Sequence, residues 1–540
     1  MSLRAGAALA LALVVCATAS HAAFASVAVA HAATAGESGT FVVLSGSDTV
    51  AVEIFHRDAA SIEGQLAFRL AGVRYRYAMK LRPDASSSNL EESVWRAADS
   101  ANAAPVVHAT VTFRGDSAIA DVIPGGLQRI ASAPGVVPFI NPSVVMMERI
   151  VRRARVLGGD SVSVPVFLPS GGRTLSVMVR RIGADSTSID LGSVQIRLAT
   201  DAAGSVRGGS VPSQRLTIVR AGYDERAIAV AKPDYSVPPD APYTGEAVRV
   251  STPERFTLAG TLTRPRGAKG RVPAVVTITG SGAEDRDEAL PGVRGYRPFR
   301  QIADALARNG IAVLRLDDRG FGESGGEFSN ATTLDFANDI RAALAWLRAR
   351  PDIDGARLAL VGHSEGGLIA PLVAETDPRL RAIALMAGPS RNGRRILEYQ
   401  NGQMIDARHP APTVRDSMLR GAMKQVDSLA TLQPWLKFFL GYDPLATAKS
   451  VRTPVLILQG ATDRQVTADQ ASELESAFRD GGNKDVTMKL FANANHLFAN
   501  DPSGDPAGYA SLPERAIRAD VLEVLAGWLG KKLKQGAAAP

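Results

Sequence analysis

Residues 358–370 read Leu-Ala-Leu-Val-Gly-His-Ser-Glu-Gly-Gly-Leu-Ile-Ala. Four apolar residues lead into Gly-His-Ser-Glu-Gly, and an apolar run that suits a helix follows. The pattern predicts a strand, a sharp turn and a helix, with Ser364 at the apex of the turn. Gly362 and Gly366 stand two positions to either side, where only small residues leave room for the cramped serine backbone. Ser364 is therefore a candidate nucleophile, although an ordinary glycine-rich turn between a strand and a helix can have the same sequence.

The residues around this turn alternate between apolar strands and amphipathic helices. Val272–Thr279, Ile311–Leu316 and Arg357–Val361 have the length and apolar character of buried strands. Helices are expected over residues 298–309 and over Thr333–Ala349. This alternation predicts an α/β fold with a doubly wound, mostly parallel sheet, whose functional site lies at the carboxyl ends of the strands.

A serine nucleophile needs a base, and the base needs an acid that orients it. Two histidines follow the turn: His409 lies in an irregular stretch between prolines, whereas His496 comes just past an expected strand. We therefore expect His496 to be the base. Asp463 follows the preceding strand and is the expected acid, with Asp469 and Asp485 as alternatives on a helix and before a strand. Each of the three chosen groups then follows a strand, in the order serine, acid, histidine.

An attacking serine also needs donors for the oxyanion that forms. One expected donor is the N–H of Glu365, directly after the serine. The other is expected in the loop after the strand that begins at residue 272, where Gly282 is the first choice and Ser281 the competitor. His363 is expected to shape the turn rather than to transfer protons. Residues 317–319, Asp-Asp-Arg, are expected to form a structural ion-pair loop near the site.

An insertion at 389–451 interrupts the strand–helix rhythm and is expected to form a helical cap. Its expected helices are Arg394–Met404, Thr413–Ala430 and Leu432–Leu440. Four aromatic residues of the insertion are candidates for lining an apolar acyl pocket: Trp435, Phe438, Phe439 and Tyr442. The alternative for each is that it packs the cap on the body of the domain.

Residues 36–232 have a different pattern, in which short alternating segments are separated by Gly, Asp, Ser and Pro clusters. The expected strands are Thr40–Leu44, Val50–Phe55, Gln65–Leu70, Val73–Leu81, Val106–Phe113, Val162–Phe167, Leu175–Arg181, Val194–Leu198 and Leu216–Arg220. They predict an antiparallel β-rich domain, either a barrel or a sandwich. The proline-dense stretch 233–245 is the expected linker to a second domain at 246–533.

Composition places the chain among globular proteins. It has 540 residues, 46% of them apolar and 21% charged, which suffices for two or three domains. The net charge of +7 arises from 61 basic and 54 acidic residues that are interspersed, so we expect no nucleic-acid partner. The sequence leaves the oligomeric state open.

The N-terminus has the pattern of a signal peptide. Arg4 precedes an apolar run that ends at Val15, and alanine-rich residues follow with no acidic residue before Glu37. We expect residues 1–33 to be removed and the protein to be periplasmic or secreted. The apolar run is too short for a stable membrane span. Cys16 is the only cysteine, so the mature chain would have no disulfide, thiol nucleophile or thiolate metal site.

Residues 233–530 resemble the α/β-hydrolase superfamily, and within it a branch of bacterial secreted serine carboxylesterases. The resemblance rests on the proline-dense linker and on four motifs: Leu258–Leu262 (LAGTL), Gly280–Asp287 (GSGAEDRD), Leu316–Gly320 (LDDRG) and Gly362–Gly367 (GHSEGG). The branch is related to dienelactone hydrolases and to prolyl-oligopeptidase-type serine peptidases. A β-rich N-terminal domain is compatible with it.

This resemblance implies a serine hydrolase that cleaves small short-acyl carboxylic esters without a cofactor or metal. It implies that Ser364, Asp463 and His496 form the catalytic triad and that the Gly-Ser-Gly loop serves the oxyanion hole. Two alternatives remain. One is a peptidase or amidase with the same triad, and the other is a non-catalytic binding protein with a vestigial hydrolase domain.

Overall fold

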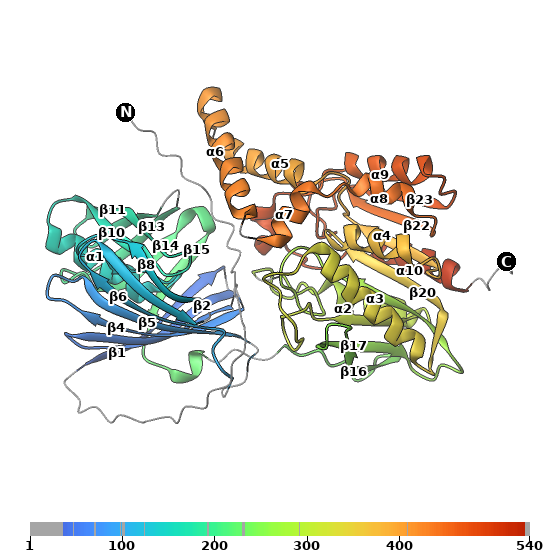
Figure 1. Ribbon diagram of the computed structural model, residues 1–540, viewed down its shortest axis with the longest axis horizontal. Coiled ribbons are helices and arrows are strands. Elements are labelled where there is room, and N and C mark those ends of the chain that lie inside the picture. Colours follow the sequence, from blue (N-terminus) through green and yellow to red (C-terminus); the bar gives the residue numbers. More distant parts are fainter. Residues whose placement is uncertain are drawn as a thin grey trace. The chain divides into compact units, whose positions relative to one another are not determined.

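The computed structural model describes residues 36–534 except 47, 70–71, 98, 100–102, 124, 192–193, 229–232, 291, 408 and 432. The expected signal peptide at 1–33 lies outside the described residues. The chain divides between residues 232 and 233 into two compact units (Figure 1). Within the described ranges, no helix combines the length and the hydropathy that crossing a bilayer requires.

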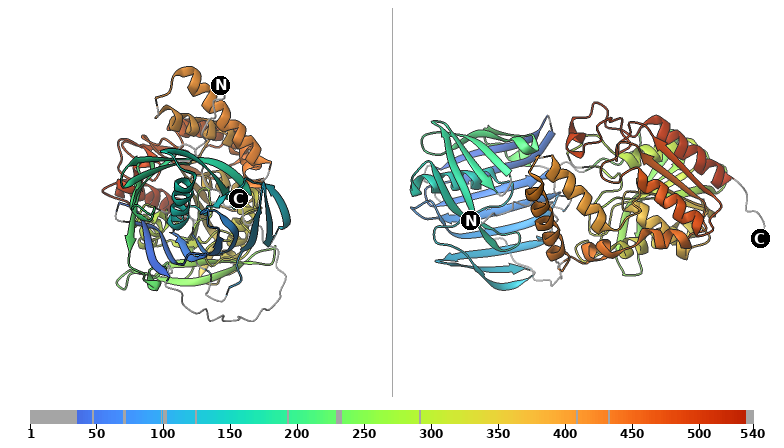
Figure 2. Two further views of the ribbon diagram at one scale, coloured as in Figure 1. Left: turned by 90° about the vertical axis from the view of Figure 1, so that its left-hand side faces the viewer. Right: turned by 90° about the horizontal axis from the view of Figure 1, so that it is seen from above.

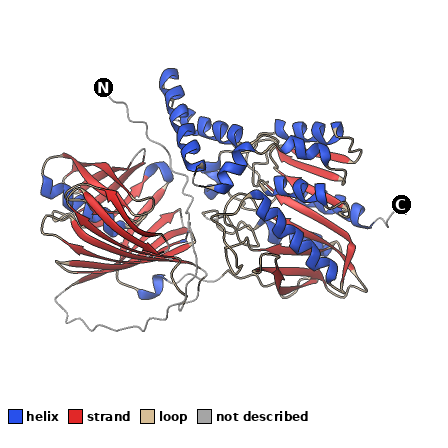
Figure 3. Ribbon diagram, in the orientation of Figure 1, coloured by secondary structure: helices blue, strands red, loops and turns tan. Residues whose placement is uncertain are grey.

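The first unit contains one continuous sheet, drawn in red in Figure 3. Its strands are β1 (Glu37–Ser45), β2 (Asp48–Arg57), β3 (Ser61–Phe68), β4 (Val73–Leu81), β5 (Ser87–Arg96), β6 (Val107–Arg114), β7 (Ser117–Ile123), β8 (Gly126–Ala131), β9 (Val137–Pro138), β10 (Ser161–Leu168), β11 (Arg173–Gly183), β12 (Ser186–Leu191), β13 (Val194–Thr200), β14 (Val206–Val211) and β15 (Leu216–Ala221). In space the order runs from β8 back to β1, then from β15 back to β9. Neighbouring strands are antiparallel except for the short β9–β10 pair. The predicted β-rich domain is thus one curved antiparallel sheet and not two stacked sheets.

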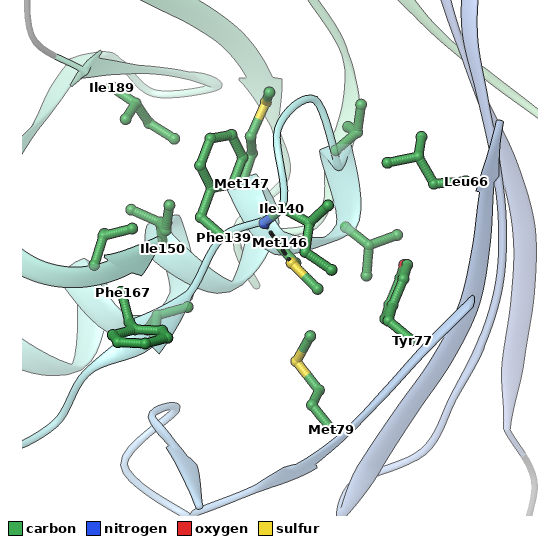
Figure 4. Packing of buried hydrophobic residues seen from close by; sticks show 14 of the residues in the cluster. Leu66, Tyr77, Met79, Phe139, Ile140, Met146, Met147, Ile150, Phe167 and Ile189 are labelled. Carbon is green, nitrogen blue, oxygen red and sulfur yellow. Dashed lines mark hydrogen bonds between the residues drawn. The ribbon is translucent and has the colours of Figure 1, made fainter. Parts of the chain in front are cut away.

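The sheet curves around a helix that the sequence did not predict, α1 (Val144–Leu157) (Figure 2). Residues from α1 and from both halves of the sheet form a single apolar cluster. Figure 4 shows Met146 and Ile150 of α1 among Leu66 and Phe167 of the strands. The first two turns of α1 are buried, and its valines and isoleucine resemble a strand in sequence.

The N-terminus of α1 is fixed by a buried carboxylate from the sheet. Glu53 of β2 accepts hydrogen bonds from the backbone N–H groups of Val144 and Val145, at 2.7 and 3.0 Å. It also accepts from the hydroxyls of Ser143 and Tyr77. A negative or acidic group is favourable at this end of a helix, so Glu53 sets where the helix begins within the sheet.

The second unit is an α/β domain around an eight-stranded sheet of described strands. These strands are β16 (Tyr243–Ser251), β17 (Thr257–Pro265), β18 (Val272–Ile278), β19 (Ala312–Leu316), β20 (Ile353–His363), β21 (Ala382–Met386), β22 (Val455–Gly460) and β23 (Val486–Phe491). Their order is β16-β17-β19-β18-β20-β21-β22-β23. β16 and β17 are antiparallel, and the six strands from β19 onward are parallel. Since β16 begins at Tyr243, the last three residues of the predicted linker belong to a strand.

Helices cover both faces of this sheet, as predicted for a doubly wound fold. The helices of the unit are α2 (Pro298–Arg308), α3 (Thr333–Ala349), α4 (Gly366–Thr376), α5 (Gly393–Asp406), α6 (Pro412–Ala430), α7 (Pro434–Gly441), α8 (Pro444–Ser450), α9 (Asp469–Asp480) and α10 (Ala519–Lys534). Val275 of β18 packs with α2 and α10 on one face. Its neighbours Ala274 and Val276 pack with α3, α4 and α9 on the other. This alternation explains the continuous apolar strands.

The cap is smaller than the predicted 389–451. Its helices are α5, α6 and α7, and α6 projects from the rest of the unit in Figure 1. Helix α8 also falls in the predicted range, but it buries Ala448 in the core beneath α4 and α9. The last helix begins at Ala519, because residues 506–511 form a short 3-10 helix and the next seven residues are irregular. Two further 3-10 helices, Pro212–Gln214 and Glu225–Ile228, lie in the first unit.

Candidate active site

The turn at Ser364 joins β20 to α4 at the carboxyl end of the sheet. Ser364 has a φ of 51°, a left-handed value that is rare for residues other than glycine. A Cβ atom on Gly362 would lie 2.0 Å from the carbonyl oxygen of Gly366, and one on Gly366 would lie 2.2 Å from that of Ile278. Both positions therefore require glycine. Ser364 is half-buried, whereas the residues on either side of it are buried, so its hydroxyl is the accessible group of the turn.

His496 and Asp463 come together at this edge of the sheet. Nδ1 of His496 lies 2.8 Å from Oδ2 of Asp463, and the two residues are 5% and 4% exposed. Oδ2 also accepts from the side chain of Gln459 at 3.0 Å. Oδ1 accepts from the N–H groups of Gln465 and Val466 at 2.8 and 2.9 Å. The carboxylate is thus fully hydrogen-bonded, which fixes the orientation of the imidazole.

No hydrogen bond joins Ser364 to His496 in the part of the chain that the structure describes. Their two segments are instead connected through His363, which precedes the serine. Nε2 of His363 lies 3.0 Å from the carbonyl oxygen of His496, and the two imidazole rings have centroids 4.9 Å apart. Hydrogen bonds in active sites can form only once substrate is bound.

The loop after β18 brings its N–H groups to the same place. The N–H of Gly280 is already used, since it donates to Glu284 at 3.0 Å and to Glu288 at 2.9 Å. The N–H groups of Ser281, Gly282 and Glu365 have no acceptor among the described residues. Gly282 has a φ of 120°, which favours glycine. The structure therefore leaves both predicted loop donors free, together with the N–H after the serine.

The side chain of Glu365 links this loop to the cap. Its carboxylate accepts from Nε1 of Trp435 at 2.8 Å and from the hydroxyl of Thr333 at 2.7 Å. Glu365 is 2% exposed, and burial raises the pKa of its carboxyl group, although Thr333, Trp435 and Ser281 each lower it. The residue after the serine thus interacts with the loop after β18 and with the cap.

The four cap aromatics have different surroundings. Trp435 stacks on Phe439, with ring centroids 5.1 Å apart, and Phe439 packs against Leu368 of α4. Phe438 stacks on Tyr442, whose hydroxyl donates to Thr447 of α8. Phe439 and Tyr442 therefore attach the cap to the body of the unit. Of the four, Trp435 is the one that contacts a residue of the serine turn through a polar group.

The predicted ion-pair loop is only partly correct. Asp317 accepts three hydrogen bonds from Arg286, one from its backbone N–H and two from its guanidinium, and Arg319 donates to Asp339 and Glu254. Asp318 has no arginine partner among the described residues.

The two oxygens of Asp318 accept from the hydroxyl of Thr279 and the N–H of Glu284. Burial raises the pKa of this carboxyl group well above its ordinary range. Asp318 was expected to carry a charge, and the structure instead favours its neutral form.

Two acidic residues beside the site, Glu284 and Glu288, were not predicted from the sequence. Burial, followed by the neighbouring Glu288 and Asp318, raises the pKa of Glu284 well above the usual value. Glu288 contacts His363 at 2.8 Å. The signal in the sequence was the density of carboxylates just after the Gly-Ser-Gly segment.

Comparison with known proteins gives the following matches. A family model described as Hydrolase_4, serine aminopeptidase, S33, matches residues 294–503, a range that includes Ser364, Asp463 and His496. The esterase EstD of Thermotoga maritima is 28% identical over 284 residues, which are 51% of this chain and 66% of that protein. Dipeptidyl aminopeptidase BIII of Pseudoxanthomonas mexicana is 27% identical over 265 residues, which are 47% of this chain and 35% of that protein.

Solved structures also match the chain. The Pyrococcus furiosus esterase Pf2001 has 18% sequence identity and a TM-score of 0.39, and the match covers 56% of this chain and 97% of that one. The hypothetical protein PA2218 of Pseudomonas aeruginosa has 17% identity and a TM-score of 0.41, with coverages of 56% and 98%.

Proposed function

We propose that this chain is a member of the α/β-hydrolase superfamily and a serine esterase acting on small carboxylic esters with short acyl groups. The observation that carries the proposal is the buried pair of His496 and Asp463. These residues follow two neighbouring parallel strands, β23 and β22, of the same sheet in which β20 ends at the serine turn. The similarity to EstD supports the choice of esters.

In the proposed mechanism, Nε2 of His496 takes the hydroxyl proton of Ser364 as the oxygen attacks the ester carbonyl carbon. Asp463 accepts the Nδ1 proton in a hydrogen bond and stabilises the imidazolium. The N–H groups of Glu365 and Gly282 donate to the oxyanion. The bond to the alcohol oxygen then breaks, and the alcohol leaves with the proton from His496.

Water completes the reaction in the same way. It gives a proton to His496 as it attacks the acyl carbon, and the serine oxygen leaves with that proton. The products are one alcohol and one carboxylic acid. We propose that the indole of Trp435 forms part of the wall that the acyl group meets, because its Nε1 is held beside the serine turn by Glu365. We assign no cofactor and no metal to the reaction.

A peptidase is the second candidate. The matched family model carries the description of a serine aminopeptidase, and a dipeptidyl aminopeptidase is among the relatives. The same triad would serve amide hydrolysis, with an amine in place of the alcohol as the leaving group.

The experiment is turnover of p-nitrophenyl esters of increasing acyl length by residues 36–540, beside a panel of aminoacyl anilides. The Ser364→Ala variant is the control. The proposal predicts cleavage of short esters that depends on the serine. Faster cleavage of anilides would make the protein a peptidase. No turnover of either panel by the folded protein would favour the non-catalytic alternative.

We also propose that the protein is exported through residues 1–33 and works in the periplasm or outside the cell. N-terminal sequencing of the protein from a bacterial host tests this. A mature chain that begins between residues 18 and 36 is expected, and a chain in the cytoplasm that retains Met1 would contradict it.

A further inference from the structure

A second histidine–carboxylate pair lies beside the first. Nδ1 of His363 is 2.8 Å from Oε1 of Glu288, and the two residues are 7% and 4% exposed. Neither side chain has a part in the mechanism above. Glu288 has a φ of 53°, a backbone conformation that glutamate rarely adopts, so the surrounding loop holds it in place against its own preference.

The hydrogen bonds of His363 determine which protons it holds. Its Nε2 faces the carbonyl oxygen of His496, which can only accept, so Nε2 carries a proton. Its Nδ1 faces Oε1 of Glu288, which also accepts from the N–H of Gly280. A neutral imidazole with its proton on Nε2 would turn a lone pair toward this oxygen. The geometry therefore fits an imidazolium that donates from both ring nitrogens.

The charges around His363 favour that state. Burial by itself lowers the pKa of His363, but the adjacent Glu288 outweighs it and the net shift is upward. Asp463 and His496 are the other titratable groups that face the ring. Glu284 accepts from the same N–H of Gly280 as Glu288, and burial, followed by Glu288 and Asp318, raises the pKa of Glu284. Tyr296 is near Glu288 as well.

This pair joins two parts of the site that are distant in sequence. On one side, Glu288 holds Gly280, the first residue of the loop that carries the proposed oxyanion donor Gly282. On the other side, His363 holds the backbone of His496. There is little free space at the junction, because a Cβ on Gly280 would be 3.4 Å from both Glu288 and the Cβ of Ser364.

We propose that Glu288 and His363 are positioning residues, which hold the oxyanion loop and the catalytic histidine in register through a continuous series of hydrogen bonds. The inference rests on the proposed function, since it assigns a purpose to the pair only if Ser364 and His496 react. The pair contacts no substrate atom in this account. It acts by keeping the donors and the base where the transition state needs them.

The test is the Glu288→Gln variant in the full mature chain. The amide can accept from Gly280, but it no longer stabilises the charge on His363, so one of the two histidine hydrogen bonds is lost. We expect kcat to fall about 10- to 100-fold, with KM changed less than about twofold. The rate at which a fluorophosphonate labels Ser364 should fall by a similar factor. Glu246→Gln, an exposed glutamate of β16 paired with Arg350, is the matched control and should leave both rates unchanged.

The pH profile separates positioning from simple structural support. The pair is complete only while His363 is protonated, so activity should fall as pH rises through the pKa of His363. Without Glu288 that pKa is lower, and the alkaline fall should move to lower pH in Glu288→Gln but not in Glu246→Gln. A Glu288→Gln variant with the kcat and the pH profile of the wild type would overturn the proposal.

Two further measurements remain decisive if that variant does not fold. In Glu288→Asp the charge remains but the carboxylate is withdrawn, so kcat should again fall, and wild-type activity would overturn the proposal. In the wild type labelled with 15N in its histidine rings, one histidine should keep both ring protons at pH 7. If no histidine keeps both ring protons at this pH, the proposal is also overturned. A wild type that cleaves amides and not esters still allows all these tests, because the fluorophosphonate reports on Ser364 directly. A wild type that is not labelled at all would overturn the proposed function as well.

Discussion

His496 Nδ1 lies 2.8 Å from Oδ2 of Asp463, at the ends of β23 and β22, which are neighbouring parallel strands. Replacing Asp463 with Asn should leave the space filled but turn the imidazole into the wrong tautomer. We expect kcat for ester cleavage to fall about 10³- to 10⁴-fold. Asp469→Asn is the matched control, since Asp469 lies on α9 in a half-exposed ion pair with Arg391. Equal losses in both variants would contradict the assignment of Asp463.

The contact between Trp435 and Glu365 predicts how firmly the cap is held. Trp435→Phe keeps a ring to stack on Phe439 but removes the donor to a buried carboxylate, which should cost about 1–3 kcal/mol. Limited proteolysis within 389–443 should therefore become faster. Trp528→Phe is the control, because its Nε1 bonds Thr487 at an exposed position. Unchanged proteolysis in Trp435→Phe would show that this contact does not hold the cap.

Asp318 predicts a dependence of stability on pH. Because its pKa is raised in the folded state, the folded protein holds this proton at pH values where the unfolded chain has lost it. This group therefore stabilises the fold less as pH rises from about 4 through the folded pKa. Asp318→Asn cannot titrate and can still bond Thr279 and Glu284. Urea unfolding at pH 5 and pH 8 measures the free energy of unfolding of the variant and of the wild type. The variant should be more stable relative to the wild type at pH 8 than at pH 5. The same difference in free energy at both pH values would contradict a neutral Asp318.

Gly362 and Gly527 predict opposite outcomes for the same substitution. A Cβ on Gly362 would collide with the backbone of Gly366, whereas nothing lies within 4 Å of a Cβ on Gly527 in α10. Gly362→Ala should lower the thermal midpoint of the second unit strongly and abolish activity. Gly527→Ala should stabilise the protein by about 0.5–1 kcal/mol, since alanine favours a helix interior. Differential scanning calorimetry compares the two, and a stable, active Gly362→Ala would refute the tight turn.

Much of the second unit could be predicted because its elements have local signals. The alternation of apolar strands with amphipathic helices gives the parallel sheet, and helix α3 begins and ends at the predicted Thr333 and Ala349. The first unit was harder. Strand β5 reads Ser-Ser-Asn-Leu-Glu-Glu-Ser-Val-Trp-Arg, and its polar residues conceal a strand whose pairing with β4 and β6 is decided by distant chain segments. Helix α1 was missed because its valines and isoleucine resemble a strand in sequence, and the strands that bury it come from distant parts of the chain.

The site shows the same division. Ser364, Asp463 and His496 were chosen because each follows a strand, which a sequence displays. The contact of Glu288 with His363 joins residues 75 positions apart, and the environment that raises the pKa of Asp318 arises only when the loops after β18 and β19 pack together. Such contacts are set by tertiary structure, so residue type and spacing did not reveal them.

The most direct test of the central claim is to locate the adduct that a fluorophosphonate forms with the mature protein, by mass spectrometry of its peptides. The account predicts a single phosphonylated residue, Ser364, with labelling lost in Ser364→Ala together with ester turnover. An adduct on another residue, or full ester turnover by Ser364→Ala, would contradict the account.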